Sequence, residues 1–148
     1  MITIRKADIS DLNNLTKLFE GYRNFYRQPS NYDKAYQFLK ERFEKKESVV
    51  YVAENENQEL IGFTQLYPIF TSTRLERAWL LNDLFVMHSG RGKGISKKLI
   101  QAAKDHCVET KAYGIMLETE RTNIIGNKLY PSVGFEKEKG NFYYWTNK

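Results

Sequence analysis

The feature that most constrains the fold of this chain is a change in hydrophobic period near residue 48. Between residues 12 and 46, apolar side chains recur at three- and four-residue steps, which is typical of amphipathic helices. Three short runs rich in β-branched and aromatic residues follow, and polar turns separate them: 48–55, 59–70 and 78–87. Consecutive strands joined by short turns predict an antiparallel meander that comes after two helices.

The remaining segments place this meander inside a longer α+β order. A short strand at the N-terminus leads to Asp8, which can cap a helix that ends before Pro29. After the meander, the pattern predicts a long helix over 94–110, a strand over 113–120, a short helix over 123–130 and a terminal hairpin over 135–145 that turns at Gly140-Asn141. The predicted element order is βααβββαβαββ.

Length and composition indicate one globular domain over residues 1–148. A chain of 148 residues suits a single core, and 41% hydrophobic residues can fill it. The longest apolar runs fall far short of the ~20 residues that cross a bilayer, and the first ten residues lack the apolar stretch of a signal peptide. We therefore expect a cytoplasmic protein that does not associate with membranes.

Metal and nucleic-acid chemistry have little support in the sequence. The single cysteine, Cys107, cannot form an internal disulfide, and His88 and His106 do not complete a zinc framework, so we expect no metal. The net charge of +5 is compatible with a polyanionic ligand, with nucleic acid or with a solubilising surface. Since no RRM, KH, zinc-finger or helix-turn-helix signature is present, we expect no nucleic-acid partner.

The segment from Val86 to Ser96 has the composition of an anion-binding turn. It joins a predicted strand to a predicted helix, and its glycines at 90, 92 and 94 allow a ligand to approach the backbone closely. The first N–H groups of a helix have no internal partners and favour negative charge. Basic side chains gather at the same place: Arg91, Lys93, Lys97 and Lys98. The glycine spacing fits neither a Walker loop nor a dinucleotide fingerprint, and a plain strand-to-helix turn is the alternative interpretation.

Two motifs in this chain resemble signatures of the GNAT N-acetyltransferase superfamily. Arg91-Gly92-Lys93-Gly94-Ile95-Ser96 is similar to the acetyl-CoA signature [QR]-x-x-G-x-[GA], with a serine in the last place. The run TNIIGNKLYPSVGF, from residue 122 to 135, is similar to N-x-x-A-x-x-x-Y-x-x-x-G-F, with Gly126 in place of alanine. The strand WLLNDLFV resembles that of the small diamine, thialysine and histone-type acetyltransferases.

This resemblance implies a fold and a reaction. The fold is a central, mostly antiparallel twisted sheet with helices on both faces, and the element order agrees over nearly all of the chain. The reaction is transfer of acetyl from acetyl-CoA to a primary amine, on a small molecule or on a protein lysine or N-terminus, by direct attack in a ternary complex. Relatives with this strand pair through their C-terminal strands, so a homodimer is expected through the aromatic run Phe142 to Trp145.

The resemblance also implies roles for individual residues. The residues implied to bind the cofactor are Leu84, Phe85, Val86, Arg91, Gly92, Lys93, Gly94, Ile95, Ser96, Asn123 and Tyr130. Among them, unpaired backbone groups at Leu84 and Val86 would bind the pantetheine, and one N–H would face the developing oxyanion. Tyr130 is the natural acid, because a phenol stays protonated at neutral pH and can donate to a departing thiolate. Asn123 and Tyr130 each have a structural alternative. Asn123 could be a helix cap. Tyr130 could be a packing residue, since Pro131 directly after it disfavours helix at the tyrosine.

The general base stays open at this point. Asn82 stands where these relatives carry a glutamate, and an amide cannot accept the proton. Asp83 is the neighbouring candidate catalytic residue, although regular strand alternation directs it to the opposite face. Glu118 and Glu120, on the next predicted strand, are alternatives that would act through water. A non-catalytic CoA-binding regulatory domain is therefore the alternative function. Aromatic residues of the first two helices could line the acceptor pocket or the core: Tyr22, Phe25, Tyr26, Tyr32 and Tyr36.

Overall fold

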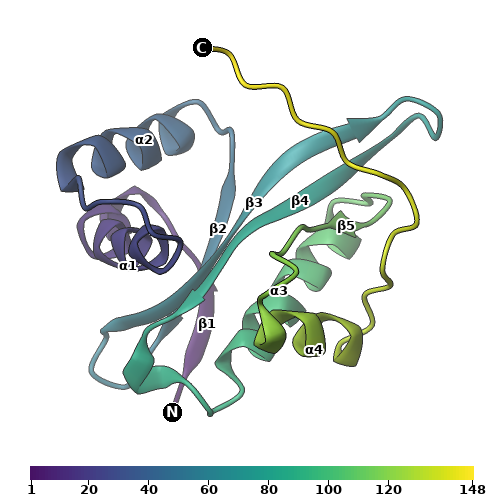
Figure 1. The fold of residues 1–148 in the computed structure, drawn as a ribbon. Helices are drawn as coiled ribbons and strands as arrows, with labels where there is room; N and C mark the ends of the chain where they lie inside the picture. Colours follow the sequence, from purple (N-terminus) through teal and green to yellow (C-terminus); the bar gives the residue numbers. More distant parts are fainter. The chain divides into compact units, whose positions relative to one another are not determined.

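The computed structural model describes residues 1–148 as two compact units, 1–117 and 118–148, and each is described here by itself. The first unit holds a five-stranded sheet in the order β1-β2-β3-β4-β5 (Figure 1). Its strands are β1 (Thr3–Lys6), β2 (Val49–Glu54), β3 (Leu60–Thr71), β4 (Glu76–Val86) and β5 (Ile115–Met116). All neighbours are antiparallel except β4 and β5, which are parallel. The predicted meander and the α+β class are confirmed.

Helices cover both faces of this sheet, as predicted. Helices α1 (Leu12–Phe25) and α2 (Tyr32–Glu44) lie on one face, and α3 (Ile95–Glu109) lies on the other (Figure 1). The first face forms a core in which Leu15 and Leu39 pack with the fully buried Phe63 of β3. On the second face, Ile95 and Leu99 of α3 pack against β2, β3 and β4. The sheet is thus buried on both sides in its centre.

The helix starts follow the local sequence signals. Asp8 caps a short 3₁₀ turn, η1 (Ile9–Asp11), which leads directly into α1, and Asp8 and Asp11 form a reciprocal capping box. The chain leaves α1 after Phe25, before Pro29, as predicted. Asn31 caps α2 by accepting a hydrogen bond from the backbone N–H of Lys34. These boundaries depend on side chains within a few residues, so a sequence can reveal them.

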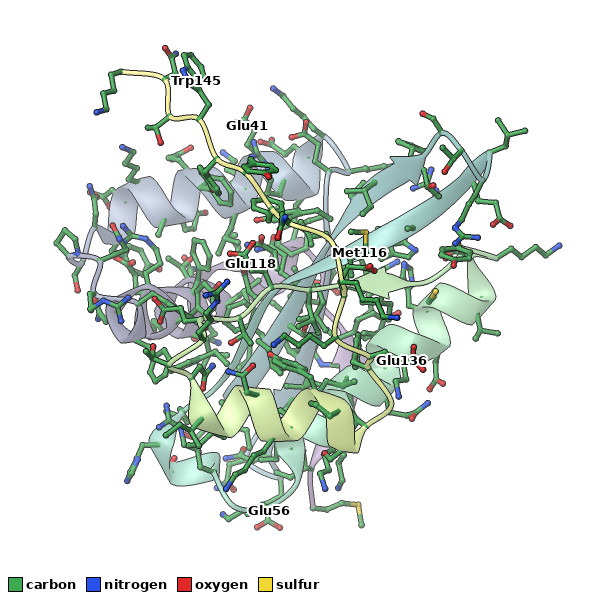
Figure 2. The ribbon with its side chains drawn as sticks, turned by 45° about the vertical axis from the view of Figure 1, so that its right-hand side comes forward. Glu41, Glu56, Met116, Glu118, Glu136 and Trp145 are labelled. Carbon is green, nitrogen blue, oxygen red and sulfur yellow. The ribbon has the colours of Figure 1, made fainter.

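The strand predicted over 113–120 is wrong in its length. Only Ile115 and Met116 pair with β4, opposite Trp79 and Leu80. An irregularity in β4 directly after this pairing provides the reason: Leu81 pairs with Leu66 and Asp83 with Gln65, which leaves Asn82 as an extra residue. Such a bulge bends a strand away from its neighbour. Figure 2 shows Met116 on β5 at the end of this short pairing.

The terminal hairpin predicted over 135–145 is also wrong, since this segment forms no strand. Residues 136–139 are all charged and residues 142–145 are all aromatic, so neither arm alternates between an apolar and a polar face. A two-stranded hairpin without a buried face is marginally stable at best. The aromatic side chains are accordingly exposed, Trp145 by 81% (Figure 2).

The second unit contains one helix, α4 (Ile124–Ser132), which Asn123 caps. Pro131 was expected to disfavour helix at Tyr130, but α4 continues through both residues. Pro131 lies in the last turn, and beyond it the N–H of Val133 bonds the carbonyl of Leu129. The proline therefore removes one donor close to the end of the helix and does not break it.

Candidate active site

The turn before α3 has the backbone conformation that its glycines permit. A 3₁₀ turn, η2 (His88–Gly90), leads to Arg91, and Gly92 and Gly94 then adopt left-handed conformations with φ of 79° and 74°. Gly94 is the N-cap residue of α3, and no side chain caps the helix. The first N–H groups of α3 thus have the unpaired arrangement that binds anions.

The surroundings of this turn suit a phosphate group. A Cβ built at Gly92 or Gly94 would meet nothing within 4 Å, so the backbone faces open space. The four basic side chains that the sequence places here, at 91, 93, 97 and 98, are all exposed. Ile95 is only 2% exposed and anchors the helix in the core. These features favour the anion-binding interpretation over a plain turn.

Arg91 is held on the inner side of the turn. Its Nε donates a hydrogen bond of 3.0 Å to the carbonyl oxygen of Val86, and its guanidinium lies 5.8 Å from the ring of Phe85 and 5.9 Å from that of Phe25. The Val86 carbonyl therefore already has a partner.

One edge of β4 is open beyond the bulge. Leu84, Phe85 and Val86 pair with β3 on one side, and β5 pairs only with residues 79 and 80 on the other. On the side of β5, the strand pairing of β4 therefore ends before the bulge. An extended ligand could hydrogen-bond this edge as a further strand would.

The bulge brings the side chains of Asn82 and Asp83 together. Regular alternation would direct them to opposite faces, but the Asn82 amide donates a hydrogen bond of 2.7 Å to the Asp83 carboxylate. Asp83 is 1% exposed, and the amide nitrogen of the fully buried Gln65 donates to its other oxygen. The hydroxyl of Thr64 donates to the Asp83 backbone carbonyl. This network fixes the bulge and the carboxylate within it.

Two tyrosines face this carboxylate in different ways. The Tyr22 hydroxyl from α1 donates a hydrogen bond of 3.0 Å to the Asn82 carbonyl oxygen and is also within hydrogen-bonding reach of the Asp83 carboxylate. Tyr67 interacts with Asp83 through charge alone. Burial raises the pKa of Asp83, and the hydrogen bonds from Asn82, Gln65 and Tyr22 offset this in part. Burial, and then the charge of Asp83, raise the pKa values of Tyr22 and Tyr67.

Sequence reasoning did not identify Thr64 and Gln65 as part of this site. A signal was present: Gln65 is an amide in the middle of an apolar strand, and a buried amide needs partners. Tyr22 was identified, but only as a possible lining or core residue. Its ring does pack in the core, 6.0 Å from Phe63 and 5.1 Å from Tyr26, while its hydroxyl reaches β4.

The second unit contains the remaining predicted residues. The Asn123 side chain accepts a hydrogen bond from the N–H of Gly126 and donates one to Thr119, so it serves as a helix cap. The Tyr130 ring packs edge-on against Phe135 at 5.9 Å. Glu118 and Glu120 are exposed and follow β5 outside any strand. Contact of Asn123 and Tyr130 with CoA stays a prediction.

The first unit also contains a cleft and two buried titratable side chains. A cleft of about 670 Å³ lies beside the glycine-rich turn, between α1, the turn from β2 to β3, and residues 85–91. Cys107 and His106 are buried on α3, and His106 contacts the Tyr51 hydroxyl at 3.1 Å.

No group of three His, Cys, Asp or Glu side chains could hold a metal ion, and no helix is long and apolar enough to cross a membrane.

Comparison with known proteins identifies the family. The family model described as the acetyltransferase (GNAT) family matches residues 12–135. The chain belongs to this family. It is 44% identical over 146 residues to an uncharacterized N-acetyltransferase, YhfO, of Bacillus subtilis, an alignment that covers 99% of this chain and 97% of the relative. The resemblance drawn from the two motifs is confirmed, and this GNAT protein is an acetyl-transferring enzyme.

Solved structures agree with this assignment. A crystal structure of a probable acetyltransferase superposes with a TM-score of 0.94 at 35% identity and covers 99% of both chains. An aminoglycoside N-acetyltransferase in complex with CoA superposes with a TM-score of 0.84 over 100% of this chain and 96% of its own, at 19% identity. The second likeness concerns the fold alone.

Proposed function

We propose that this chain transfers the acetyl group of acetyl-CoA to a primary amine, on a small molecule or on a protein lysine or N-terminus, by direct attack in a ternary complex. The observation that carries the proposal is the course of β4, whose open edge leads into the uncapped start of α3. An edge that can bond an amide-bearing arm is thus continuous with a turn that can bind its phosphates.

The residues of the turn and of the strand edge would hold acetyl-CoA, which supplies an activated thioester. The N–H groups that begin α3 and the nearby basic side chains would bind the pyrophosphate, and Leu84 and its neighbours would bind the pantetheine arm. Asn123 would contact that arm, and Tyr130 would protonate the leaving thiolate. The CoA complex of the aminoglycoside N-acetyltransferase, with a similar fold, supports this cosubstrate.

Asp83 is the residue that we propose as general base. An amine is mostly protonated at neutral pH and attacks only after it loses a proton. A buried carboxylate has a raised pKa and is therefore a stronger base than an exposed one, which brings it closer to the pKa of the proton donor. Asn82 and Gln65 hold its two oxygens in place.

Turnover measurements test the proposed reaction. Purified protein, acetyl-CoA and a panel of amines would be combined, with release of the CoA thiol as the readout; the panel would contain polyamines, an aminoglycoside, and peptides with a free N-terminus or lysine. We expect turnover with at least one class. CoA binding by calorimetry without turnover on any amine would favour the non-catalytic CoA-binding domain. Gly92→Glu is the binding control, because it places an anion and a strained backbone in the phosphate turn.

We also propose a homodimer. Support comes from four consecutive exposed aromatic residues near the C-terminus, from Phe142 at 75% to Trp145 at 81% exposure, since a monomer rarely leaves such a group exposed. Sedimentation at micromolar concentration should give twice the mass of one chain, and removal of residues 142–148 should give a monomer. A full-length protein that sediments as one chain would contradict the proposal. A cytoplasmic location stays a prediction.

A further inference from the structure

Asp83 is too deeply buried to meet an acceptor amine directly. Asp83 is 1% exposed, and the side-chain amides of Gln65 and Asn82 donate hydrogen bonds to its two carboxylate oxygens. A general base must lie within hydrogen-bond reach of the proton that it removes, or reach it through one intermediary. If Asp83 is the base, as proposed above, another group must carry the proton to it.

Tyr22 lies where such an intermediary is needed. Its hydroxyl donates a hydrogen bond to the Asn82 carbonyl oxygen and lies within reach of the Asp83 carboxylate, to which the same O–H can turn, while its side chain remains partly exposed. A phenol hydroxyl has both a donor and acceptor lone pairs, so it can accept one proton as it passes on another. Helix α1 fixes the ring through contacts with Phe19 and Phe63, which keeps the hydroxyl at the bulge.

We propose that the Tyr22 hydroxyl carries the proton from the acceptor ammonium to Asp83. One N–H bond of the ammonium breaks as an O–H bond forms on Tyr22, and the original Tyr22 proton moves to the Asp83 carboxylate. The products are a neutral amine and a neutral carboxyl, and Tyr22 is unchanged. No further reactant is needed, because the acceptor supplies the proton and Asp83 receives it.

The electrostatics of the site agree with a relay that stays neutral. Burial and the charge of Asp83 raise the pKa of Tyr22, so the phenol does not ionise by itself at working pH. The same effects raise the pKa of Tyr67, which also faces Asp83. Tyr67 has no hydrogen bond to the carboxylate, and this difference makes it a matched control.

The test compares Tyr22→Phe with Tyr67→Phe. Each change removes one hydroxyl near Asp83 and keeps the ring. In Tyr22→Phe we expect kcat/KM for the amine to fall at least about tenfold, as for loss of general base catalysis. The KM for acetyl-CoA and the midpoint of thermal unfolding should change little. Tyr67→Phe should keep wild-type kcat/KM within about twofold. Equal loss in the two variants, or wild-type activity in Tyr22→Phe, would overturn the proposal.

The pH profile separates a relay from a structural role. Without the relay only amine that is already neutral can react, so the rise of kcat/KM with pH should move upward towards the pKa of the acceptor amine. The loss in Tyr22→Phe should accordingly be large near neutral pH and shrink in alkaline solution. A loss of the same size at every pH would indicate a displaced bulge and count against proton transfer.

A measurement on the unmodified enzyme guards against a variant that does not fold. Two protons move together in the relay, so the rate should depend on the deuterium fraction of the solvent along a curve, and a straight line would exclude the relay. Failure of the underlying function has a different signature, because it would abolish turnover in the wild type or leave Asp83→Asn fully active. Loss in Asp83→Asn together with normal Tyr22→Phe would refute the relay alone.

Discussion

Replacing Gly94 by alanine tests whether the turn before α3 requires left-handed backbone. Gly94 has φ of 74° and ψ of 15°, a conformation that costs an L-residue about 1–2 kcal/mol. A Cβ at this position would meet nothing within 4 Å, so no steric clash adds to the cost. The whole effect of Gly94→Ala should therefore be about 1–2 kcal/mol of backbone strain.

This strain can appear in either of two measurements. If the variant keeps the turn, the free energy of unfolding falls by that amount. If the turn relaxes, stability is retained, but binding of CoA must restore the conformation. Affinity then falls by about 5- to 30-fold, because about 1.4 kcal/mol corresponds to a factor of ten. Urea unfolding and titration calorimetry with CoA should give losses that sum to about 1–2 kcal/mol.

Two further variants control for the added methyl group. Gly114→Ala adds the same Cβ into open space at a position without a left-handed conformation, so it should be neutral or stabilising by up to about 1 kcal/mol. Gly94→Asn should lose less than Gly94→Ala, because asparagine tolerates the left-handed region better than alanine. If Gly94→Ala behaves like Gly114→Ala in both assays, the reasoning about this turn is refuted.

Three other perturbations follow from the structure. Asp83→Asn should reduce kcat at least about tenfold. Because burial raises the folded-state pKa of Asp83, the stability of the wild type falls as pH rises through that pKa. In urea unfolding, the variant should therefore be more stable than the wild type at neutral pH, and this difference should vanish in acid. Tyr130→Phe should lower kcat at least about tenfold with little change in the KM for acetyl-CoA, and wild-type kcat across the pH range would return Tyr130 to a packing role. The pKa of His106 is lowered, because burial and then the charge of Lys6 outweigh the opposite effect of Glu109. The stability of the wild type should therefore fall as pH drops below about 6.5, the ordinary pKa of histidine. Urea unfolding of His106→Gln should show a smaller fall.

Most of the fold could be predicted from the sequence because its signals are local. The capping box at Asp8, the end of α1 before Pro29 and the change of period near residue 48 each depend on residues close together in the chain. The failures concern the C-terminal third. A strand over 113–120 requires a partner along its whole length, and the bulge at Asn82 ends that partnership. The hairpin at 135–145 requires a face to bury, and its two arms do not provide one.

The sequence by itself determined the glycine-rich turn before α3, because glycine spacing, helix start and basic side chains lie within thirteen residues of one another, from 86 to 98. The tertiary structure alone decided the carboxylate site. An extra residue in β4 cannot be seen until β3 lies beside it, and this bulge turns Asp83 towards Asn82. The hydroxyl of Tyr22 meets β4 across 60 residues of sequence, because α1 packs over the buried centre of the sheet. The periodicity of a sequence predicts a regular strand, whereas the pairing of β4 with β3 and the packing of α1 on the sheet determine where β4 departs from it.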